Sequence, residues 1–324
     1  MDYDVIATLG PSTSTARLWQ GLLEAGATAF RLNTSHLTLD NLDCWMERIE
    51  QFQQDQPVPV PLYLDLQGSK WRLGQFPSFL LEPGSSVNLV LAETCSTAGC
   101  LPVPHGDFFR AAGVSGNEIS LNDARIRLEL LEAHPDRMHA RVIQGGEIAP
   151  RKGITFLDSG YRLESTNAKD RAICERTRRL GYVRYAISYV RDGQEMLRYR
   201  QDLGDGVHLA AKLERRPALE DALQVACSAD SLWLCRGDLG AELGLREMAV
   251  AVQEFSRAVT VFPVPAILAG QVLEHMTEHE TPTRSEVCYL YDALESGYHG
   301  VVLSDETAIG RFPQAAVCTA GMFR

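Results

Sequence analysis

The stretches AKLE at residues 211–214, RGDLG at residues 236–240 and FRLNTSH at residues 30–36 each set charged side chains at the end of a short apolar run. Each run has the length and composition of a buried parallel strand. Catalytic groups of a parallel barrel lie at the carboxyl ends of its strands, so the three segments predict one shared pocket. Two carboxylates, an ammonium and a guanidinium would meet there, which suits a divalent cation and a small, highly negative substrate.

The remainder of the chain alternates strand patterns with helix patterns. Helical periodicity follows the apolar runs, for example over residues 39–54 and 284–296. Alternating units of this kind predict a parallel sheet, and eight of them predict a closed (β/α)8 barrel of the α/β class. An open doubly wound sheet is the alternative. The expected strands are residues 5–10, 29–32, 60–66, 182–190, 207–213, 231–235, 265–269 and 300–303.

One segment interrupts this alternation. From residue 75 to about 152 the chain carries Gly-Ser, Pro-His-Gly and Gly-Gly punctuation, with alternating pieces at 86–91 and 125–131 between the turns. This pattern predicts a small β-rich domain inserted after the third strand. We therefore expect a barrel formed by residues 1–74 and 154–324, with a lid domain formed by residues 75–153.

Composition limits the possible partners and location. The chain has 324 residues, 45% of them hydrophobic, and a formal net charge of −11. An acidic chain argues against nucleic-acid binding, which depends on cationic contacts to phosphates. The acidic N-terminus runs directly into a strand, and no apolar run approaches the roughly 20 residues that span a bilayer. The sequence thus predicts a cytoplasmic protein that binds no membrane.

The eight cysteines are scattered, and none forms a CxxC motif. This spacing gives no sign of a structural metal site. We expect buried structural thiols in a reducing compartment.

The first candidate site is a metal centre. Lys212 and Glu214 lie two residues apart and therefore point to the same face of a strand. Asp238 ends the next strand, and two carboxylates from neighbouring strands suit Mg²⁺ or Mn²⁺, which prefer oxygen ligands. The alternative is a structural Lys–Glu ion pair with Asp238 as a helix N-cap.

The neighbouring segments offer groups for anions. Backbone N–H groups of Gly237 and its neighbours could hold a carboxylate or phosphate, although a plain loop is an alternative. The guanidinium of Arg31 could bind phosphate through two parallel hydrogen bonds. Asn33 and Ser35 follow it and could equally form a capping network.

Eight ordered segments, covering nearly the whole chain, resemble those of the pyruvate kinase family. RLNTSH at 31–36 is similar to the family's RLNFSH, and LDLQGSK at 64–70 is similar to its LDTKGPE or LDLQGPK segment. The family fold is a (β/α)8 barrel with a β-barrel lid inserted after strand three. The other matching segments are IATLGP at 6–11, RKG at 151–153, AKLE at 211–214, RGDLG at 236–240, PTRSEV at 282–287 and LSDETA at 303–308.

The resemblance implies catalytic and substrate-binding roles for the matching residues. Glu214 and Asp238 would ligate the catalytic Mg²⁺ or Mn²⁺, and Lys212 would neutralise the transferring phosphoryl group of phosphoenolpyruvate. Arg31 would bind phosphate, and the backbone of Gly237 and Asp238 would hold the substrate carboxylate. This is phosphoryl transfer by positioning and charge neutralisation.

The resemblance also implies binding sites for the nucleotide and for a monovalent cation. Arg72 and Lys152 would face ADP or ATP. Asn33, Ser35 and Asp65 correspond to the monovalent-cation site.

Three departures from the family pattern affect the expected chemistry. Lys70 stands where potassium-dependent members carry Glu, so an internal ammonium would replace the monovalent cation and no potassium requirement is expected. Gly270, at the substrate-binding position, replaces a threonine whose hydroxyl assists protonation of enolpyruvate in the family. Arg215 replaces the asparagine that follows the metal-binding Glu214.

The end of the chain carries a further expectation. The sequence stops close to the eighth helix, so the resemblance implies that the family's C-terminal αβ domain, and regulation through it, are absent. A homodimer through barrel faces is the expected assembly. Asp123 resembles a lid residue near the nucleotide, or it belongs to a solvated turn.

Three functions are compatible with this pocket. The first is a pyruvate kinase-like phosphotransferase acting on phosphoenolpyruvate or pyruvate with ADP or ATP. The second is a divalent-metal pyruvate aldolase or lyase, in which Gly270 would leave an enolate free to react with a larger substrate. The third is a relative that binds metabolites without catalysis.

Overall fold

The computed structural model describes residues 1–68, 70–112, 117–122, 125–157 and 167–324. Within these ranges, eight parallel strands close into a barrel in the order β1-β16-β15-β14-β13-β12-β3-β2. This closure confirms the (β/α)8 architecture and excludes the open sheet. The barrel strands are β1 (Asp4–Leu9), β2 (Ala29–Asn33), β3 (Leu62–Leu66), β12 (Val183–Ile187), β13 (Leu209–Leu213), β14 (Ser231–Cys235), β15 (Ala266–Ala269) and β16 (Gly300–Leu303).

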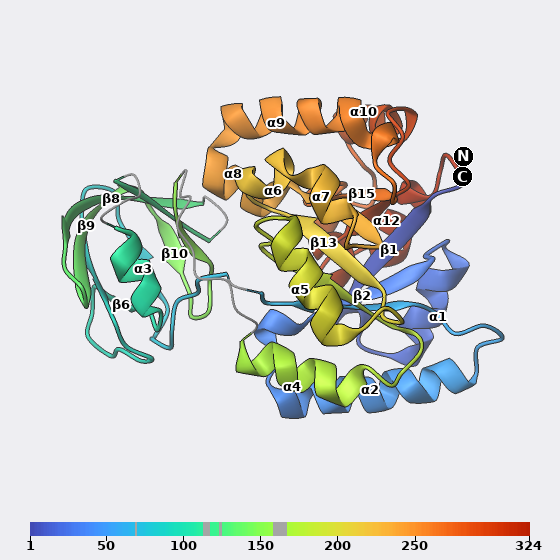
Figure 1. Cartoon of the computed structure of the whole chain (residues 1–324), viewed down its shortest axis with the longest axis horizontal. Helices are drawn as coiled ribbons and strands as arrows, with labels where there is room; N and C mark the ends of the chain where they lie inside the picture. Colours follow the sequence, from blue (N-terminus) through green and yellow to red (C-terminus); the bar gives the residue numbers. More distant parts are fainter. Residues whose placement is uncertain (69, 113–116, 123–124, 158–166) are drawn as a thin grey trace.

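Helices surround the barrel, as Figure 1 shows. Side-chain caps fix several of their starts: Thr38 accepts from the Asn41 N–H at α2, and Thr283 and Glu286 form a reciprocal capping box at α10. The α-helices of the barrel are α1 (Ala16–Glu24), α2 (Leu39–Gln54), α4 (Ala168–Thr177), α5 (Gly193–Leu203), α6 (Arg216–Glu220), α7 (Ala222–Ala226), α8 (Arg236–Leu243), α9 (Leu245–Ala258), α10 (Arg284–Glu295), α11 (Asp305–Ala308) and α12 (Pro313–Ala320). Short 3-10 helices are η1 (Pro11–Thr13), η2 (Thr34–His36), η3 (Val259–Val261) and η4 (Glu274–Thr277).

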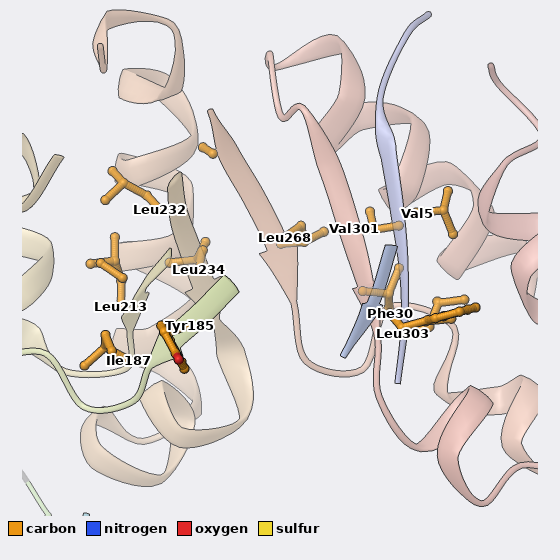
Figure 2. Packing of buried hydrophobic residues seen from close by; sticks show 14 of the residues in the cluster. Val5, Phe30, Tyr185, Ile187, Leu213, Leu232, Leu234, Leu268, Val301 and Leu303 are labelled. Atoms are coloured by element: carbon orange, nitrogen blue, oxygen red, sulfur yellow. The ribbon is translucent and has the colours of Figure 1, made fainter. Parts of the chain in front are cut away.

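Two-residue alternation along the strands creates two separate cores. One set of side chains, which includes Phe30, Leu213 and Leu268, points outward and packs against the helices (Figure 2). The other set, which includes Tyr63, Trp233 and Ile267, fills the interior of the barrel. The parity of each strand therefore decides which residues can reach a pocket at the end of the barrel.

A lid of strands lies to one side of the barrel in Figure 1. It contains a six-stranded sheet in the order β11-β7-β8-β9-β5-β6 and a two-stranded sheet of β10 and β4. Its hydrophobic cluster runs from Trp71 to Phe156, and the limits 75 and 153 remain our proposal for its extent. Its elements are β4 (Phe79–Leu81), β5 (Ser86–Val90), β6 (Cys100–Pro102), α3 (Gly106–Ala111), β7 (Glu118–Leu121), β8 (Ile126–Ala133), β9 (Arg137–Gln144), β10 (Gly146–Ile148) and β11 (Ile154–Phe156).

The structure corrects several local predictions. The helical segment after β13 is divided into α6 and α7 at Asp221, and the glycine-rich segment after β14 is not a plain loop but the start of helix α8. Exposed thiols also overturn part of the cysteine prediction. Cys100, Cys174 and Cys235 are buried, whereas Cys44, Cys227, Cys288 and Cys318 are exposed. No helix formed by the described residues is both long and apolar enough to cross a bilayer.

A polar cluster lies at the amino-terminal end of the barrel. His208 Nε2 is 3.3 Å from the hydroxyl of Tyr63, which also accepts a hydrogen bond of 2.9 Å from Arg184. Burial, assisted by the positive charge of Arg184, lowers the pKa of His208 to about 4. The folded protein therefore keeps this imidazole neutral at pH values where the unfolded chain takes up a proton.

We expect the folded state to lose stability as the pH falls from about 6.5 to 4, because only the unfolded chain protonates His208 in this range. The slope is at most about 1.4 kcal/mol per pH unit. The variant His208→Gln should lack this contribution in urea unfolding curves recorded by circular dichroism across the same pH range. Parallel curves for the two proteins would contradict the assignment.

Candidate active site

A ring of polar side chains lies at the carboxyl end of the barrel. These side chains point into the barrel, as the apolar interior residues two positions earlier on each strand do, but they carry hydroxyl, charged and thiol groups. The ring occupies the end where catalytic groups of a (β/α)8 barrel are found. Its members in the described chain are Thr8, Arg31, Asp65, Ser188, Lys212, Glu214, Cys235 and Ser304.

Asp65 is the centre of this ring. Its Oδ2 accepts hydrogen bonds of 2.7 and 2.5 Å from Nε and Nη2 of Arg31. Its Oδ1 accepts from the hydroxyl of Ser188 at 2.9 Å and from Nζ of Lys212 at 3.1 Å. Burial alone would raise the pKa of Asp65, but the charges of Lys212 and Arg31 outweigh it and hold the pKa below its usual value. The carboxylate is therefore a permanent buried anion between two cations.

Glu214 and Lys212 form the next part of the ring. Lys212 Nζ lies 2.9 Å from Glu214 Oε1, so the ion pair that was one alternative in the sequence is present. The other oxygen of Glu214 accepts a 2.7 Å hydrogen bond from the backbone N–H of Tyr189, a non-glycine residue with a φ of 60°. Burial raises the pKa of Glu214 to about 7, opposed by Lys212 and strengthened by the charge of Asp238.

Asp238 lies in the first turn of α8 and is not its N-cap, because that position belongs to Cys235. Its carboxylate forms an ion pair with Lys70, and the Tyr189 hydroxyl donates to it at 3.3 Å. Burial acts to raise the pKa of Asp238, but the ammonium groups of Lys70 and Lys212 hold it well below its usual value. A carboxyl hydrogen bond with Glu214 also lowers it, so the two acids lie side by side.

These two carboxylates fit a divalent cation. Two adjacent buried acids repel each other unless a cation or a shared proton lies between them. In the structure Lys70 supplies a positive charge at Asp238. No group of three or more Asp, Glu, His or Cys residues within the described ranges forms a complete metal site. Mg²⁺ or Mn²⁺ would thus take two protein oxygens and complete its coordination with substrate and water, as Mg²⁺ does at phosphate sites.

A cavity of about 390 Å³ opens above this ring, between the barrel and the lid. The lid and its connections contribute Lys70, Arg72, Arg125 and Lys152 to the cavity lining. Cationic groups thus face the acidic floor from the opposite side. A ligand with several phosphate or carboxylate groups matches this charge distribution.

The residues that the sequence assigned to monovalent-cation and nucleotide sites also border the cavity. Asn33 caps the following turn, because its Oδ1 accepts from the Ser35 N–H at 3.1 Å. The hydroxyl of Ser35 accepts from Arg72 at 3.1 Å, and Arg72 also donates to the Arg151 carbonyl. The capping alternative is thus present alongside the position in the cavity.

Helix α4 holds two of these loops in place, a contribution that the sequence analysis missed. The Lys169 ammonium donates to the Thr34 carbonyl at 2.6 Å, and Asp170 accepts from the backbone N–H groups of Gln67 and Gly68. Burial lowers the pKa of Lys169 to about 8 and raises that of Asp170 to about 6. The sequence signal for this role was the pair of opposite charges, Lys169 and Asp170, in the first turn of α4.

Gly270 brings β15 close to the start of α8. Its φ is +82°, and its carbonyl accepts hydrogen bonds of 3.0 and 2.5 Å from Nε and Nη2 of Arg236. A Cβ at this position would lie 3.0 Å from the Gly237 nitrogen, closer than nine in ten real contacts. A side chain at this position would therefore be strained in this backbone conformation, and no side chain takes the place of the family threonine.

Arg215 and Asp123 are the two remaining residues that the sequence singled out. Arg215 is buried, and its Nε lies 3.7 Å from Glu242, so its charge is paired with a carboxylate other than Glu214 and Asp238. Asp123 lies outside the described residues.

Comparisons with known proteins give one consistent family. The family model described as the pyruvate kinase barrel domain matches residues 2–317. A pyruvate kinase of Agrobacterium vitis is 32% identical over 317 residues, which are 97% of this chain and 65% of that protein. A pyruvate kinase of Methylorubrum extorquens is 31% identical, over 97% of this chain and 66% of that protein. The chain thus spans about two thirds of the length of these relatives.

Solved structures agree on the fold. The crystal structure of a pyruvate kinase from Cryptosporidium parvum has a TM-score of 0.85 to this chain, at 23% sequence identity. The match covers 98% of this chain and 68% of that one.

Replacement of the central carboxylate tests the buried charge network. The variant Asp65→Asn leaves two buried cations short of their counter-ion, and we expect it to lower the free energy of unfolding by about 3–5 kcal/mol. Asp43→Asn is the matched control, because it breaks an exposed ion pair with Arg176 and should cost less than about 1 kcal/mol. Equal losses in urea unfolding would show that the Asp65 network does not stabilise the barrel.

Proposed function

This chain belongs to the pyruvate kinase family, and from that premise we propose that its cavity transfers a phosphoryl group between phosphoenolpyruvate and ADP. One observation carries the proposal. Acidic and cationic groups line the same cavity, with Glu214 and Asp238 on the floor and Arg72 and Lys152 on the lid side. This arrangement accommodates a phosphorylated carboxylic acid below a nucleotide.

The acidic floor would hold the divalent cation through Glu214 and Asp238. When bound, Mg²⁺ or Mn²⁺ would neutralise charge on phosphate and carboxylate oxygens. Lys70 would then leave Asp238, because its ammonium forms an ion pair with the same carboxylate. The N–H groups of Gly237 and Asp238, in the first turn of α8, would receive the substrate carboxylate.

The cationic residues would stabilise the phosphoryl group as it moves. Burial alone would lower the pKa of Lys212, but Asp65 and Glu214 raise it, so the side chain stays charged throughout the neutral range. A fixed, desolvated ammonium stabilises developing negative charge without reorganisation. Arg31 is oriented by Asp65 and Thr8 and would bind phosphate from the neighbouring strand.

The two other functions have no comparable support. Every relative named above is a pyruvate kinase, and none is an aldolase or lyase. A cytoplasmic location and a homodimer formed through barrel faces remain expectations that accompany the proposal.

Potassium independence is a further part of the proposal. Lys70 runs from the lid connection into the cavity, and a Cβ at Gly153 would lie only 2.5 Å from its Cε. Glycine at position 153 thus leaves the passage that the long side chain needs. The ammonium would supply one positive charge to the cavity, which is the charge that a bound monovalent cation would otherwise provide.

The first test is ATP formation from phosphoenolpyruvate and ADP with Mg²⁺ or Mn²⁺, measured for the wild type and for Lys212→Met. We expect turnover in the wild type and a loss of at least about 10²-fold in kcat for the variant, as when one preorganised charge is removed. Absence of ATP formation in the wild type would overturn the proposed reaction.

The second test addresses potassium. Wild-type activity should not change when KCl replaces tetramethylammonium chloride at constant ionic strength. Lys70→Glu should lower activity and make it dependent on KCl, whereas Arg246→Glu, an exposed charge reversal, should do neither. A strong rise of wild-type activity with KCl would refute an internal cation.

A further inference from the structure

The floor of the cavity contains a thiol that the proposed mechanism does not use. Cys235 is the last residue of β14, is 7% exposed and lines the cavity. It belongs to the interior cluster of the barrel, so its side chain points inward with the ring of polar groups. Of the eight cysteines, it alone borders this cavity.

The strands on either side of β14, which are β13 and β15, carry other residues of the proposed site. The register pairs Leu213 with Leu234, which places Glu214 next to Cys235 on one side. On the other side Cys235 pairs with Ala269, the residue before Gly270. The thiol therefore lies between the expected metal carboxylate and the position where the family threonine is missing.

Gly270 and Cys235 border the same part of the floor. A Cβ built on Gly270 would lie 3.0 Å from the Gly237 nitrogen and 3.2 Å from the Arg236 nitrogen, the residue after Cys235. A hydroxyl-bearing side chain at position 270 would thus press on the backbone next to the thiol. Gly270 has no side chain to donate a proton, whereas Cys235 presents a thiol to the same cavity.

A second group marks the same floor as a ligand position. Trp233 lies two residues before Cys235 on the same face of β14, is 1% exposed and lines the cavity. Its Nε1–H has no hydrogen-bond partner among the described residues. A buried donor without an acceptor costs free energy, so an oxygen of a ligand or a water is expected against it.

We propose that Cys235 is the proton donor that completes the reaction, delivering its thiol proton to C3 of enolpyruvate. This role rests on the proposed phosphoryl transfer. The S–H bond breaks and the C3–H bond forms, so that the enolate becomes the ketone of pyruvate and the sulfur becomes a thiolate. A cavity water then returns a proton to the sulfur.

The neighbouring strand carries a charge that suits this role. The ammonium of Lys212 lies on β13, next to β14, where it would stabilise the thiolate left by proton transfer.

The test is exchange of the pyruvate methyl hydrogens with D₂O, followed by proton NMR in the presence of Mg²⁺ and ATP. The same thiol must act in both directions, so the thiolate would remove the hydrogen that the thiol delivers. We expect Cys235→Ala to reduce the exchange rate by about 10²–10⁴-fold. The KM for phosphoenolpyruvate should stay within about threefold, because a proton donor acts in the transition state.

Two controls separate chemistry from folding. Cys174→Ala removes a buried thiol of α4 that lies in the other core and should leave the exchange rate unchanged. Cys235→Ser replaces the thiol with a hydroxyl, a smaller proton donor, and should recover part of the rate lost in the alanine variant. Exchange by Cys235→Ala within about threefold of wild type would overturn the role of the thiol.

The outcomes also separate this inference from the proposed function. A wild type that forms ATP, with exchange unaffected by Cys235→Ala, refutes the thiol alone. If the wild type exchanges the methyl hydrogens and Cys235→Ala does not, yet the wild type forms no ATP, the phosphoryl transfer alone is refuted. A wild type that does neither refutes both.

Discussion

The buried carboxylate of Asp65 is the interaction on which the rest of the site depends. It binds Arg31 through one oxygen and Ser188 and Lys212 mainly through the other, at distances of 2.5 to 3.1 Å. Two cations could not remain inside a barrel without this counter-charge, since desolvation of an unpaired ion costs several kcal/mol. The same contacts fix the directions of the guanidinium and the ammonium. The network that pairs the buried charges therefore also orients the two cations that border the cavity.

The lid adds a second constraint, because it brings opposite charge to the acidic floor. Lys70 crosses from the lid connection to Asp238, and Arg125 of the lid lies 3.9 Å from Glu274 of the barrel. These contacts join two separately packed hydrophobic clusters across the cavity. A polyanionic ligand would replace the direct ion pairs with contacts to both sides.

Features that follow from the periodicity of the sequence were predicted, whereas features that depend on contacts between distant residues were missed. Strand positions and interior parity follow from two-residue alternation, so the barrel and the meeting of Glu214 with Asp238 could be anticipated. The start of α8 at Arg236 could not, because its glycines indicate a loop when read in isolation. The roles of Tyr189 and Trp233 depend on partners from other strands, which no local pattern records. The pairing of Lys70 with Asp238, separated by 168 residues, is of the same kind.

The central claim is that Glu214 and Asp238 form the floor of a metal-dependent phosphate site. Binding of Mn²⁺ followed by electron paramagnetic resonance tests it most directly, with and without phosphoenolpyruvate. The account predicts one Mn²⁺ per chain, tighter binding when phosphoenolpyruvate is present, and a loss of affinity of at least about tenfold in Asp238→Asn. The exposed control Asp40→Asn should bind as the wild type does. Unchanged Mn²⁺ affinity in Asp238→Asn would contradict the account.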